Sequence, residues 1–548
     1  MDYQLAEFSH RKRAVSFNTD VVKGIARKDV PNAQRYVDNI IRCGESQYPE
    51  GFVYKGSVRC NPLEEYNVIT RARAGNARIY DIARSDVYLV KYVFSLNGKE
   101  FPPQYMYLPF LGQAAMFHIS GKNFAVAPVM GDRAFEIDEN SVFIRIPRAP
   151  ISFNRTTHTV IIDDVRVNAD VVYSQLHNNG GKRSRNRSDL IRLGHVQSSL
   201  PHYLFCKYGL HGAFEKYTGT RPIIMQEADY DPAQYPPEHW VVVKSHGKEP
   251  DGLNPRRKSG YANMATTLIM LVDRGAWSDL TKSFAAGFFY VIDHFPDMVT
   301  DPGDLSETWY WCVFMAIIQW GEGNNHGRLV GDVETHLRSL DSYVDQETVK
   351  TLEGVNVNCK DLYDLMAYIM REMRTMLESN RGKEACLYDK RLEVLRYLLR
   401  DINNSMFEFL FKITGNSKKA QPPYEDILRK YFNPWLIHGV SSAAEHPEVS
   451  SVSNPSDNMF FKVTSAIVQQ TDTHGRGKSQ DAKPIGPTMY LDRSFAEITG
   501  FGVLIKSTPI GNNRFNPCVK LDPITRVTVA DPKHKPVLDG VQRLIQRV

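Results

Sequence analysis

The stretch Met116–Val129, MFHISGKNFAVAPV, shows the pattern that fills much of the first third of the chain. Two short runs of β-type residues, Met116–Ile119 and Phe124–Val129, are separated by polar residues and a glycine. Further runs of the same kind are Val87–Phe94, Ser141–Ile146 and Thr157–Ile162. We therefore predict a mainly β module between residues 54 and 172.

The spacing of apolar residues changes to that of helices beyond Asn263. Two stripes show it most clearly: Leu362, Leu365, Met366, Ile369, Met373, Met376 and Leu377, then Leu392, Leu395, Leu399, Ile402, Met406 and Phe409. The methionines of the first stripe could line an adaptable binding groove, but at helical spacing interior packing is favoured. The sequence as a whole predicts an α+β chain of several modules.

Length and composition describe a folded protein with more than one core. Single cores stop growing near roughly 250 to 300 residues, and this chain has 548. The hydrophobic fraction of 42% permits a large buried interior, while a net charge of +5 restricts any nucleic-acid surface to local patches. The apolar runs 285–292 and 312–320 are shorter than the roughly 20 residues of a membrane span. We expect a soluble protein without a secretory signal.

Seven scattered cysteines without a CxxC pair argue against a disulfide framework and a zinc knuckle. Polar, Pro- and Ser-containing passages at 415–423 and 438–456 mark module boundaries, and β-type runs return at Phe461–Val468 and Phe501–Ile505. A basic run follows Gly181 and consists of Lys182, Arg183, Arg185 and Arg187. We expect an exposed loop there, with a solvated loop and a phosphate contact both open.

Three local motifs suggest catalysis but fail on inspection. Gly475–Ser479 ends in Gly-Lys-Ser like a phosphate-binding loop, yet Asp472 stands where the first glycine of that motif belongs. Asn168–Asp170 matches the start of a magnesium-binding NADFDGD motif but lacks its two later aspartates. Asp163 and Asp164 are adjacent at a strand end, where a turn role is favoured over a shared metal. We predict neither catalytic nor metal-ligating residues in this chain.

Two further passages, and their order along the chain, resemble those of a known protein family. The text YLPFLGQAAMFHISGKNFAVAPVM (Tyr107–Met130), followed by VFIRIPR (Val142–Arg148), resembles the β-subunit passage of multisubunit DNA-directed RNA polymerases that forms a hairpin in the protrusion. Near the other end, FGVLIKSTPIGNNR (Phe501–Arg514) resembles the fork segment of that subunit, G-R-I/V-C-P-I/V-E-T-P-E-G-x-N-I-G-L. The chain thus resembles the N-terminal half of a β subunit, of the split type found in giant bacteriophages.

The sequence also departs from the family pattern. The glutamate after Thr-Pro is Ile510, and the family's double arginine is replaced by Gln469 and Gln470 or displaced to Arg476. The family's Arg-Ala-Gly-Phe passage survives at best as Arg493-Ser494-Phe495. Functions of those missing side chains are not carried over to this chain.

The resemblance implies four parts, one wall of the DNA cleft and a set of partners. The parts are a protrusion-like mixed β module (1–155), a lobe-like α/β insertion (156–385), a helical return to the protrusion (386–455) and a β fork-like segment (456–548). Partners are a C-terminal β-like subunit, β′-like subunits, template DNA and nascent RNA. Mg²⁺ is expected on a partner subunit, and no cofactor is expected on this chain. The polymerase is expected to act in the cytoplasm of the infected bacterial host or to be packaged in the virion.

The expected nucleic-acid-binding residues lie mainly in the fork-like segment, where basic residues stand among glycines and prolines. The full set is Arg476, Lys478, Lys483, Arg493, Lys506, Asn512, Asn513 and Arg514, together with Lys182, Arg183, Arg185 and Arg187. A solvated hairpin is the alternative for each of these residues. A phage structural or virion protein without catalytic activity is the alternative for the chain as a whole.

Overall fold

The structure is a computed structural model in which the chain divides into two compact units. Unit 1 comprises residues 1–134, 345–355 and 382–548, and unit 2 comprises 135–344 and 356–381. The residues that the structure describes are 30–73, 85–110, 116–126, 129–132, 134–137, 140–146, 150–174, 176, 197–246, 266–295, 298–299, 301–320, 326–379, 387–416, 423–441, 449–452, 467–470, 494, 511–514, 519–521, 528–530 and 536. Their mixture of helices and mainly antiparallel sheets confirms the predicted α+β class.

Unit 1 has a four-stranded antiparallel sheet near the start of the chain. Its central strand β2 pairs with β1 on one side and with β3 and β4 on the other. The strands are β1 (Phe52–Arg59), β2 (Val87–Leu96), β3 (Lys99–Glu100) and β4 (Gln104–Pro109). The pairing of β1 shifts register between Tyr54 and Gly56, and Gly56 has a φ of +119° that L side chains rarely adopt.

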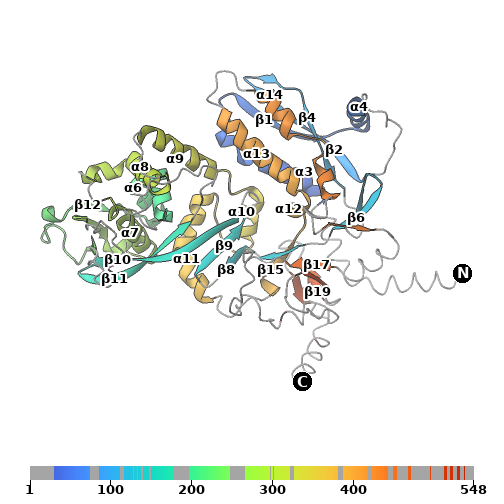
Figure 1. Cartoon of the computed structure of the whole chain (residues 1–548). Coiled ribbons are helices and arrows are strands. Elements are labelled where there is room, and N and C mark those ends of the chain that lie inside the picture. Colours follow the sequence, from blue (N-terminus) through green and yellow to red (C-terminus); the bar gives the residue numbers. More distant parts are fainter. Residues whose placement is uncertain are drawn as a thin grey trace, which may run out of the picture. The chain divides into compact units, whose positions relative to one another are not determined.

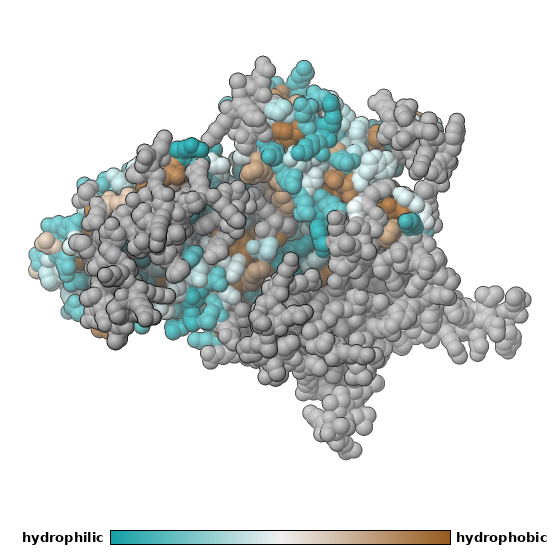
Figure 2. All heavy atoms as spheres, viewed as in Figure 1, coloured by the Kyte–Doolittle hydropathy of each residue, from teal (hydrophilic) through white to brown (hydrophobic). Residues whose placement is uncertain are grey.

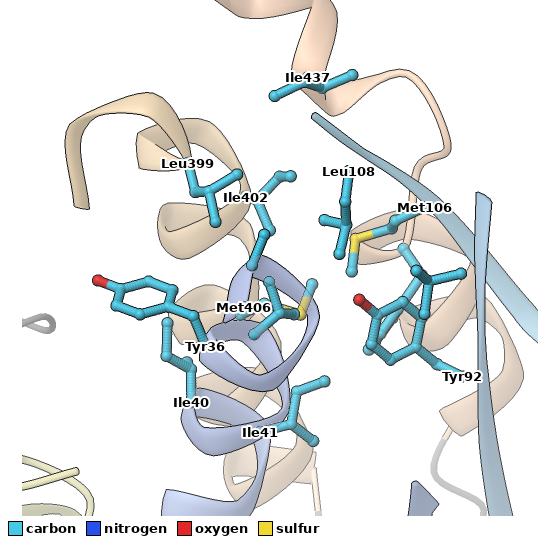
Figure 3. Close-up of a cluster of buried hydrophobic side chains, with 14 of the residues drawn as sticks. Tyr36, Ile40, Ile41, Tyr92, Met106, Leu108, Leu399, Ile402, Met406 and Ile437 are labelled. Atoms are coloured by element: carbon cyan, nitrogen blue, oxygen red, sulfur yellow. The ribbon is translucent and has the colours of Figure 1, made fainter. Parts of the chain in front are cut away.

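Helices α3 and α13 pack side by side against this sheet (Figure 1). Ile41 of α3, Met406 of α13, Tyr92 of β2, and Met106 and Leu108 of β4 lie in one apolar core (Figure 3). On α3 the buried positions repeat at helical spacing, as Ala33, Tyr36, Val37, Ile40 and Ile41. The helices of unit 1 are α3 (Val30–Cys43), α4 (Pro62–Arg73), α10 (Gln346–Glu353), α12 (Leu395–Leu398), α13 (Arg400–Asn416) and α14 (Tyr424–Tyr431).

The continuous helix predicted over 392–409 is wrong at its start. Leu392 lies on a strand, β15 (Lys390–Glu393), where it pairs with Met130. A break at Leu399, with φ −97° and ψ 20°, then separates α12 from α13. All the apolar positions of the stripe are nevertheless buried, because a strand followed by two helices can bring the same residues to one core.

Three further sheets of the described residues belong to unit 1. The predicted run at 116–119 is β5 (Met116–Ile119), while the run predicted over 124–129 agrees with β6 (Lys122–Val126) only up to Val126. β5 and β6 form a hairpin whose turn residues Ser120 and Gly121 both have positive φ. The other strands are β7 (Val129–Asp132), β16 (Val449–Val452), β17 (Ile467–Gln470), β18 (Gly511–Arg514), β19 (Val519–Leu521) and β20 (Thr528–Ala530). β16 pairs with β6, and β15, β7, β17 and β18 form one sheet in that order.

Unit 2 contains a seven-stranded antiparallel sheet in the order β12-β14-β13-β10-β9-β8, with β11 also paired to β10. Its strands are β8 (Phe135–Ile137), β9 (Ser141–Arg145), β10 (Pro150–Ile162), β11 (Val165–Ser174), β12 (Ile223–Gln226), β13 (Trp240–Ser245) and β14 (Leu268–Asp273). The predicted runs at 141–146 and 157–162 lie on β9 and β10. The long β10–β11 hairpin turns at Asp163 and Asp164, whose φ values are +47° and +62°.

The helices of unit 2 enclose an aromatic core around Trp311, which is fully buried. They are α6 (Leu200–Thr218), α7 (Asp279–Ile292), α8 (Thr308–Trp320), α9 (His326–Leu340) and α11 (Leu362–Ser379). Of the methionines in the predicted stripe of α11, Met366 and Met373 are buried as predicted, while Met376 is only partly buried. Inside α6, Gly209 has a φ of +73°, and an added Cβ would lie 3.0 Å from the Ser306 carbonyl oxygen.

None of the described helices combines the length and apolar character that a membrane span requires. On the face drawn in Figure 2, hydrophobic residues form separate small patches among hydrophilic ones. The division into parts at 155, 385 and 455 stays a prediction.

Candidate nucleic-acid interface

Within the fork-like segment, two paired strands enclose residues 471–510. Ile467–Gln470 (β17) pairs antiparallel with Gly511–Arg514 (β18), so that Gln470 lies opposite Gly511. The intervening residues 471–510, which carry five of the twelve predicted nucleic-acid-binding residues, therefore leave and return at one point of the fold. Residues held at both ends lose less conformational freedom on binding a ligand than a free tail does.

β17 is joined to the rest of unit 1 through β7. Gln469 pairs with Val129, and Gln470 pairs with Met130, in a short parallel ladder. On its other edge β7 pairs antiparallel with β15, where Glu393 lies opposite Val129 and Leu392 opposite Met130. The base of residues 471–510 thus depends on two residues of β7 that are each paired on both sides.

A second tether lies within the segment, beside Arg493. The Leu387 backbone N–H donates a hydrogen bond of 2.8 Å to the hydroxyl oxygen of Ser494, and both residues are buried. Since Ser494 follows Arg493 directly, this contact anchors that part of the segment to unit 1.

The structure places three of the twelve predicted binding residues. Asn512, Asn513 and Arg514 lie on β18, with backbone partners Gln469, Val468 and Ile467. The other nine lie outside the described residues: Arg476, Lys478, Lys483, Arg493, Lys506, Lys182, Arg183, Arg185 and Arg187. The run predicted at 501–505 also lies outside them.

The basic run at 182–187 also stands between two neighbouring points of the fold, in unit 2. The chain leaves β11 at Ser174 and returns at Ser198, whose carbonyl oxygen accepts a hydrogen bond of 3.4 Å from the Ser174 backbone N–H. Tyr173 and Ser199 form an isolated antiparallel bridge beside it. Both predicted basic segments therefore start and end at paired backbone.

A mostly buried cluster of charged side chains is formed by residues of β15 and α12. Glu393 is at its centre, in contact with Arg391, while its second carboxylate oxygen lies 3.5 Å from Nη1 of Arg396. Nη1 of Arg391 also donates a hydrogen bond of 2.6 Å to the Thr351 hydroxyl oxygen on α10. The side chain of Glu393 is 10% exposed and those of Arg391 and Arg396 are 16% and 19% exposed. We call Arg391, Glu393 and Arg396 the Glu393 cluster.

Two further ionisable groups, Asp345 and Tyr36, are buried near this cluster. Asp345 caps the N-terminus of α10 by accepting hydrogen bonds from the backbone N–H groups of Glu347 and Thr348, at 3.3 and 3.0 Å. Burial raises the pKa of its carboxyl group above the usual range, against the lowering effect of those hydrogen bonds. Burial also raises the pKa of the Tyr36 hydroxyl on α3 above its usual value.

The aspartates that suggested a metal have structural partners. Asp163 accepts a hydrogen bond from the Val242 backbone N–H (3.0 Å) and another from Nη2 of Arg274 (2.7 Å), which confirms its turn role. Asp170 lies 3.6 Å from Nη1 of Arg155. Within the part of the chain that the structure describes, no three His, Cys, Asp or Glu side chains gather as a metal site.

The fold is therefore that of a two-unit α+β protein with two basic segments on paired bases. A family profile described as non-virion RNA polymerase subunit matches residues 7–543, and the chain belongs to that family. It is a subunit of an RNA polymerase, as the sequence predicted at this level, and other subunits of that enzyme are its partners. No curated protein sequence matches the chain.

The Glu393 cluster is the feature that the sequence did not predict. Its members, with Tyr36, Asp345 and Thr351, come from residues 36 to 396, and no local motif unites them. One signal was available, since charged residues are rarely buried unless they are paired: Arg391 directly precedes the apolar stripe that starts at Leu392, and Glu393 and Arg396 lie between its members.

Proposed function

We propose that this chain is the part of the polymerase that corresponds to the N-terminal half of β, building one wall of the DNA cleft and its fork loop. In this role it supports template-directed RNA synthesis in the infected host cell. Its partners are a C-terminal β-like subunit, β′-like subunits, template DNA and nascent RNA.

The observation that carries the proposal is the way unit 1 is assembled. One hydrophobic core joins early residues, from Ala33 to Met130, with late ones, from Leu387 to Ile437, while unit 2 is formed by the chain between them. A protrusion completed by a helical return, with a lobe inserted between its parts, has this same chain order. This shared chain order supports the proposal alongside the short motifs.

The paired base at β17 and β18 gives further support. The end of the passage that resembles the fork, Gly511–Arg514, pairs with the strand that precedes residues 471–510. A basic segment closed at its base suits a finger that touches phosphates, because phosphate contacts position a nucleic acid without reading its sequence.

The chemistry of RNA synthesis assigns this wall a positioning role. Phosphoryl transfer needs Mg²⁺ ions that stabilise the attacking and leaving oxygens. We place the Mg²⁺ ligands on a partner subunit. Arg476, Lys478 and the other basic residues of this chain then hold DNA and RNA by their phosphates and keep the reacting ends aligned.

The first test is to purify the tagged chain from infected cells and assay the complex for DNA-templated nucleotide incorporation. Large partner subunits, one carrying NADFDGD, together with template-dependent RNA synthesis are the expected result. Crosslinking with mass spectrometry should connect residues 471–510 to nucleic acid and to the subunit that holds the metal. A complex in which those residues crosslink only to solvent-exposed protein far from nucleic acid contradicts the cleft-wall assignment.

The second test replaces Arg476 and Lys478 by Ala in the assembled enzyme. The affinity of the elongation complex falls as salt concentration rises. Losing two phosphate contacts should make the slope of log affinity against log salt concentration shallower by roughly 1.5. The matched control replaces Arg429 and Lys430, an adjacent exposed basic pair on α14. An unchanged slope in the first variant, or an equal change in the control, rejects these residues as phosphate contacts.

A further inference from the structure

The position of residues 471–510 depends on the register of a small sheet. In the row that crosses β15, β7 and β17, Glu393, Val129 and Gln469 lie side by side, and the next row contains Leu392, Met130 and Gln470. A strand that slips by one residue turns each of its side chains to the opposite face. With a ladder of only two residue pairs, β17 cannot fix the register by itself.

The side chains of β15 distinguish the correct register from its neighbours. Leu392 is buried in the apolar core with Met130, while Arg391 and Glu393, on the opposite face, belong to the Glu393 cluster. A slip by one residue would move Leu392 out of the core and bring a charged side chain into it. Burying a charge without its partner costs far more than an exposed ion pair contributes.

The Glu393 cluster also connects β15 to elements distant in the sequence. Arg391 reaches Thr351 on α10, and Arg396 on α12 lies close enough to Tyr36 on α3 to interact with its hydroxyl. α10 is held against α3 by a second ion pair, Arg35 to Glu347 at 3.6 Å. The strand is therefore linked to α10 and α12 as well as to its neighbour β7.

We propose that the Glu393 cluster is a positioning device: it sets the register of β15 on β7 and thereby the base from which residues 471–510 extend. Buried ion pairs are poor sources of net stability, and their best-attested use is to specify one register among several. Glu393 is a positioning residue and touches no substrate. The consequence for transcription rests on the proposed function of residues 471–510, whereas the structural consequence does not.

The test is hydrogen exchange on the full chain with Glu393→Gln, which removes the negative charge and keeps the shape. The backbone amides of 467–470 and 511–514 should exchange about tenfold faster or more, because the base opens locally. Peptides from α6 and α8 of unit 2 should be unchanged. Glu425→Gln is the matched control, since Glu425 pairs with Arg429 at the surface of α14 in the same unit.

A milder variant covers the case in which Glu393→Gln does not fold. Arg391→Lys keeps the charge but loses the paired donors of the guanidinium group, and should produce the same pattern at a smaller amplitude. If either folded variant loosens α3 and α10 while β17 and β18 exchange as in the unaltered chain, the cluster stabilises unit 1 without positioning the base. That outcome overturns the proposal.

The assembled polymerase separates this inference from the proposed function. Glu393→Gln should make the salt dependence of affinity shallower, as the double variant Arg476→Ala with Lys478→Ala does. Combining all three substitutions should add little to the double variant, because Glu393→Gln and the double variant act on the same phosphate contacts. If the base loosens but neither variant changes the slope, the positioning role stands and the phosphate-binding role fails. If only the loop variant changes the slope and the base stays protected, the positioning role alone is rejected.

Discussion

Unit 2 and unit 1 bury different kinds of side chain. Around Trp311 in unit 2, the rings of Phe205 and Phe288 lie with centroids 4.7 and 5.9 Å away, and the ring of His202 lies 5.8 Å away. Unit 1 has an apolar core of similar character, but beside it Arg391, Glu393 and Arg396 are mostly buried. Unit 2 also has a partly buried pair, His158 and Asp293 at 3.0 Å, whereas unit 1 gathers three charged side chains in one cluster.

The difference shows that the contacts that stabilise a fold and the contacts that select one strand register need not be the same. Apolar burial is non-directional and scales with the area removed from water, so it holds unit 2 together without selecting one strand register. An ion cluster contributes little net stability but penalises every arrangement that leaves a charge unpaired. Unit 1, which has short strands from distant parts of the chain, has more registers to exclude.

The largest expected effect tests the aromatic core. Trp311→Ala should destabilise unit 2 by about 3 to 5 kcal/mol, since it leaves a cavity and removes the hydrogen bond from Nε1 to the Leu305 carbonyl oxygen. Trp309→Ala, two residues earlier and 44% exposed, should cost less than about 1 kcal/mol. Denaturant-dependent hydrogen exchange measures each unit separately. Equal costs for the two tryptophans would contradict the importance of this core.

The next effect is a pH dependence confined to unit 2. His202 is fully buried, donates from Nε2 to the Trp311 carbonyl oxygen (2.8 Å), and burial lowers its pKa to about 4. Because the unfolded chain binds a proton near pH 6.5, the stabilisation is present above that pH and is lost as the pH falls toward 4, by about 3 kcal/mol.

His202→Phe removes the titrating group, so its unit-2 stability should fall less between pH 6.5 and 4 than that of the unaltered chain. Hydrogen exchange at several pH values, corrected for intrinsic rates, gives the comparison. Parallel pH profiles for the two proteins would show that His202 is not the group responsible.

A smaller effect tests whether directional contacts also matter in unit 2. Asp163→Ala should cost about 2 kcal/mol, because alanine is strained at a φ of +47° and because the contacts with Arg274 and Val242 are lost. Asp164→Asn should change the free energy of unfolding by less than about 0.5 kcal/mol, since that side chain is 91% exposed. Thermal unfolding of the full chain distinguishes them. If Asp163→Ala leaves the free energy of unfolding unchanged, the contacts of Asp163 do not help to stabilise this sheet.

The smallest effect has the opposite sign and concerns unit 1. Asparagine caps helices as well as aspartate does, so Asp345→Asn should keep the cap of α10 and relieve the burial of a carboxylate, with a gain under about 1 kcal/mol at pH 7. Because burial raises the pKa of Asp345, its contribution to stability is full below pH 3.8 and is lost as the pH rises through the raised value.

The gain from Asp345→Asn should therefore disappear below pH 3.8, where both side chains are neutral. Unit-1 hydrogen exchange at acid and neutral pH provides the measurement. A loss of stability at pH 7 would mean that the charge of Asp345 supports unit 1.

Where the pattern of apolar residues was regular, sequence and structure agree closely. Strand β5 has the predicted bounds 116–119, and α11 covers the predicted 362–377. The mistake at Leu392 arose because a buried strand and a buried helix both leave apolar residues at intervals that a short stripe cannot separate. α6 was missed because it is buried on several sides and has no single apolar stripe, although the Ser199 cap, Pro201 and Gly219 mark its ends.

The candidate site was only partly accessible to sequence reasoning. Basic residues among glycines and prolines indicated loops, and two passages near the ends of the chain resembled a family. The matched profile over residues 7–543 agrees with a polymerase subunit. The pairing at the base of residues 471–510 could not be predicted. Gln469 and Glu393 lie in one row of a sheet because each pairs with Val129, on opposite edges of β7. Such pairing depends on residues hundreds of positions apart.

The sequence alone determined the α+β class, the positions of the regular strands and helices, and the polymerase relationship, because each is set by local spacing or short motifs. Only the tertiary structure decided which segments share a core and which buried charges face one another. Those outcomes follow from long-range packing, in which a carboxylate such as Glu393 is acceptable only where folding brings Arg391 and Arg396 to it.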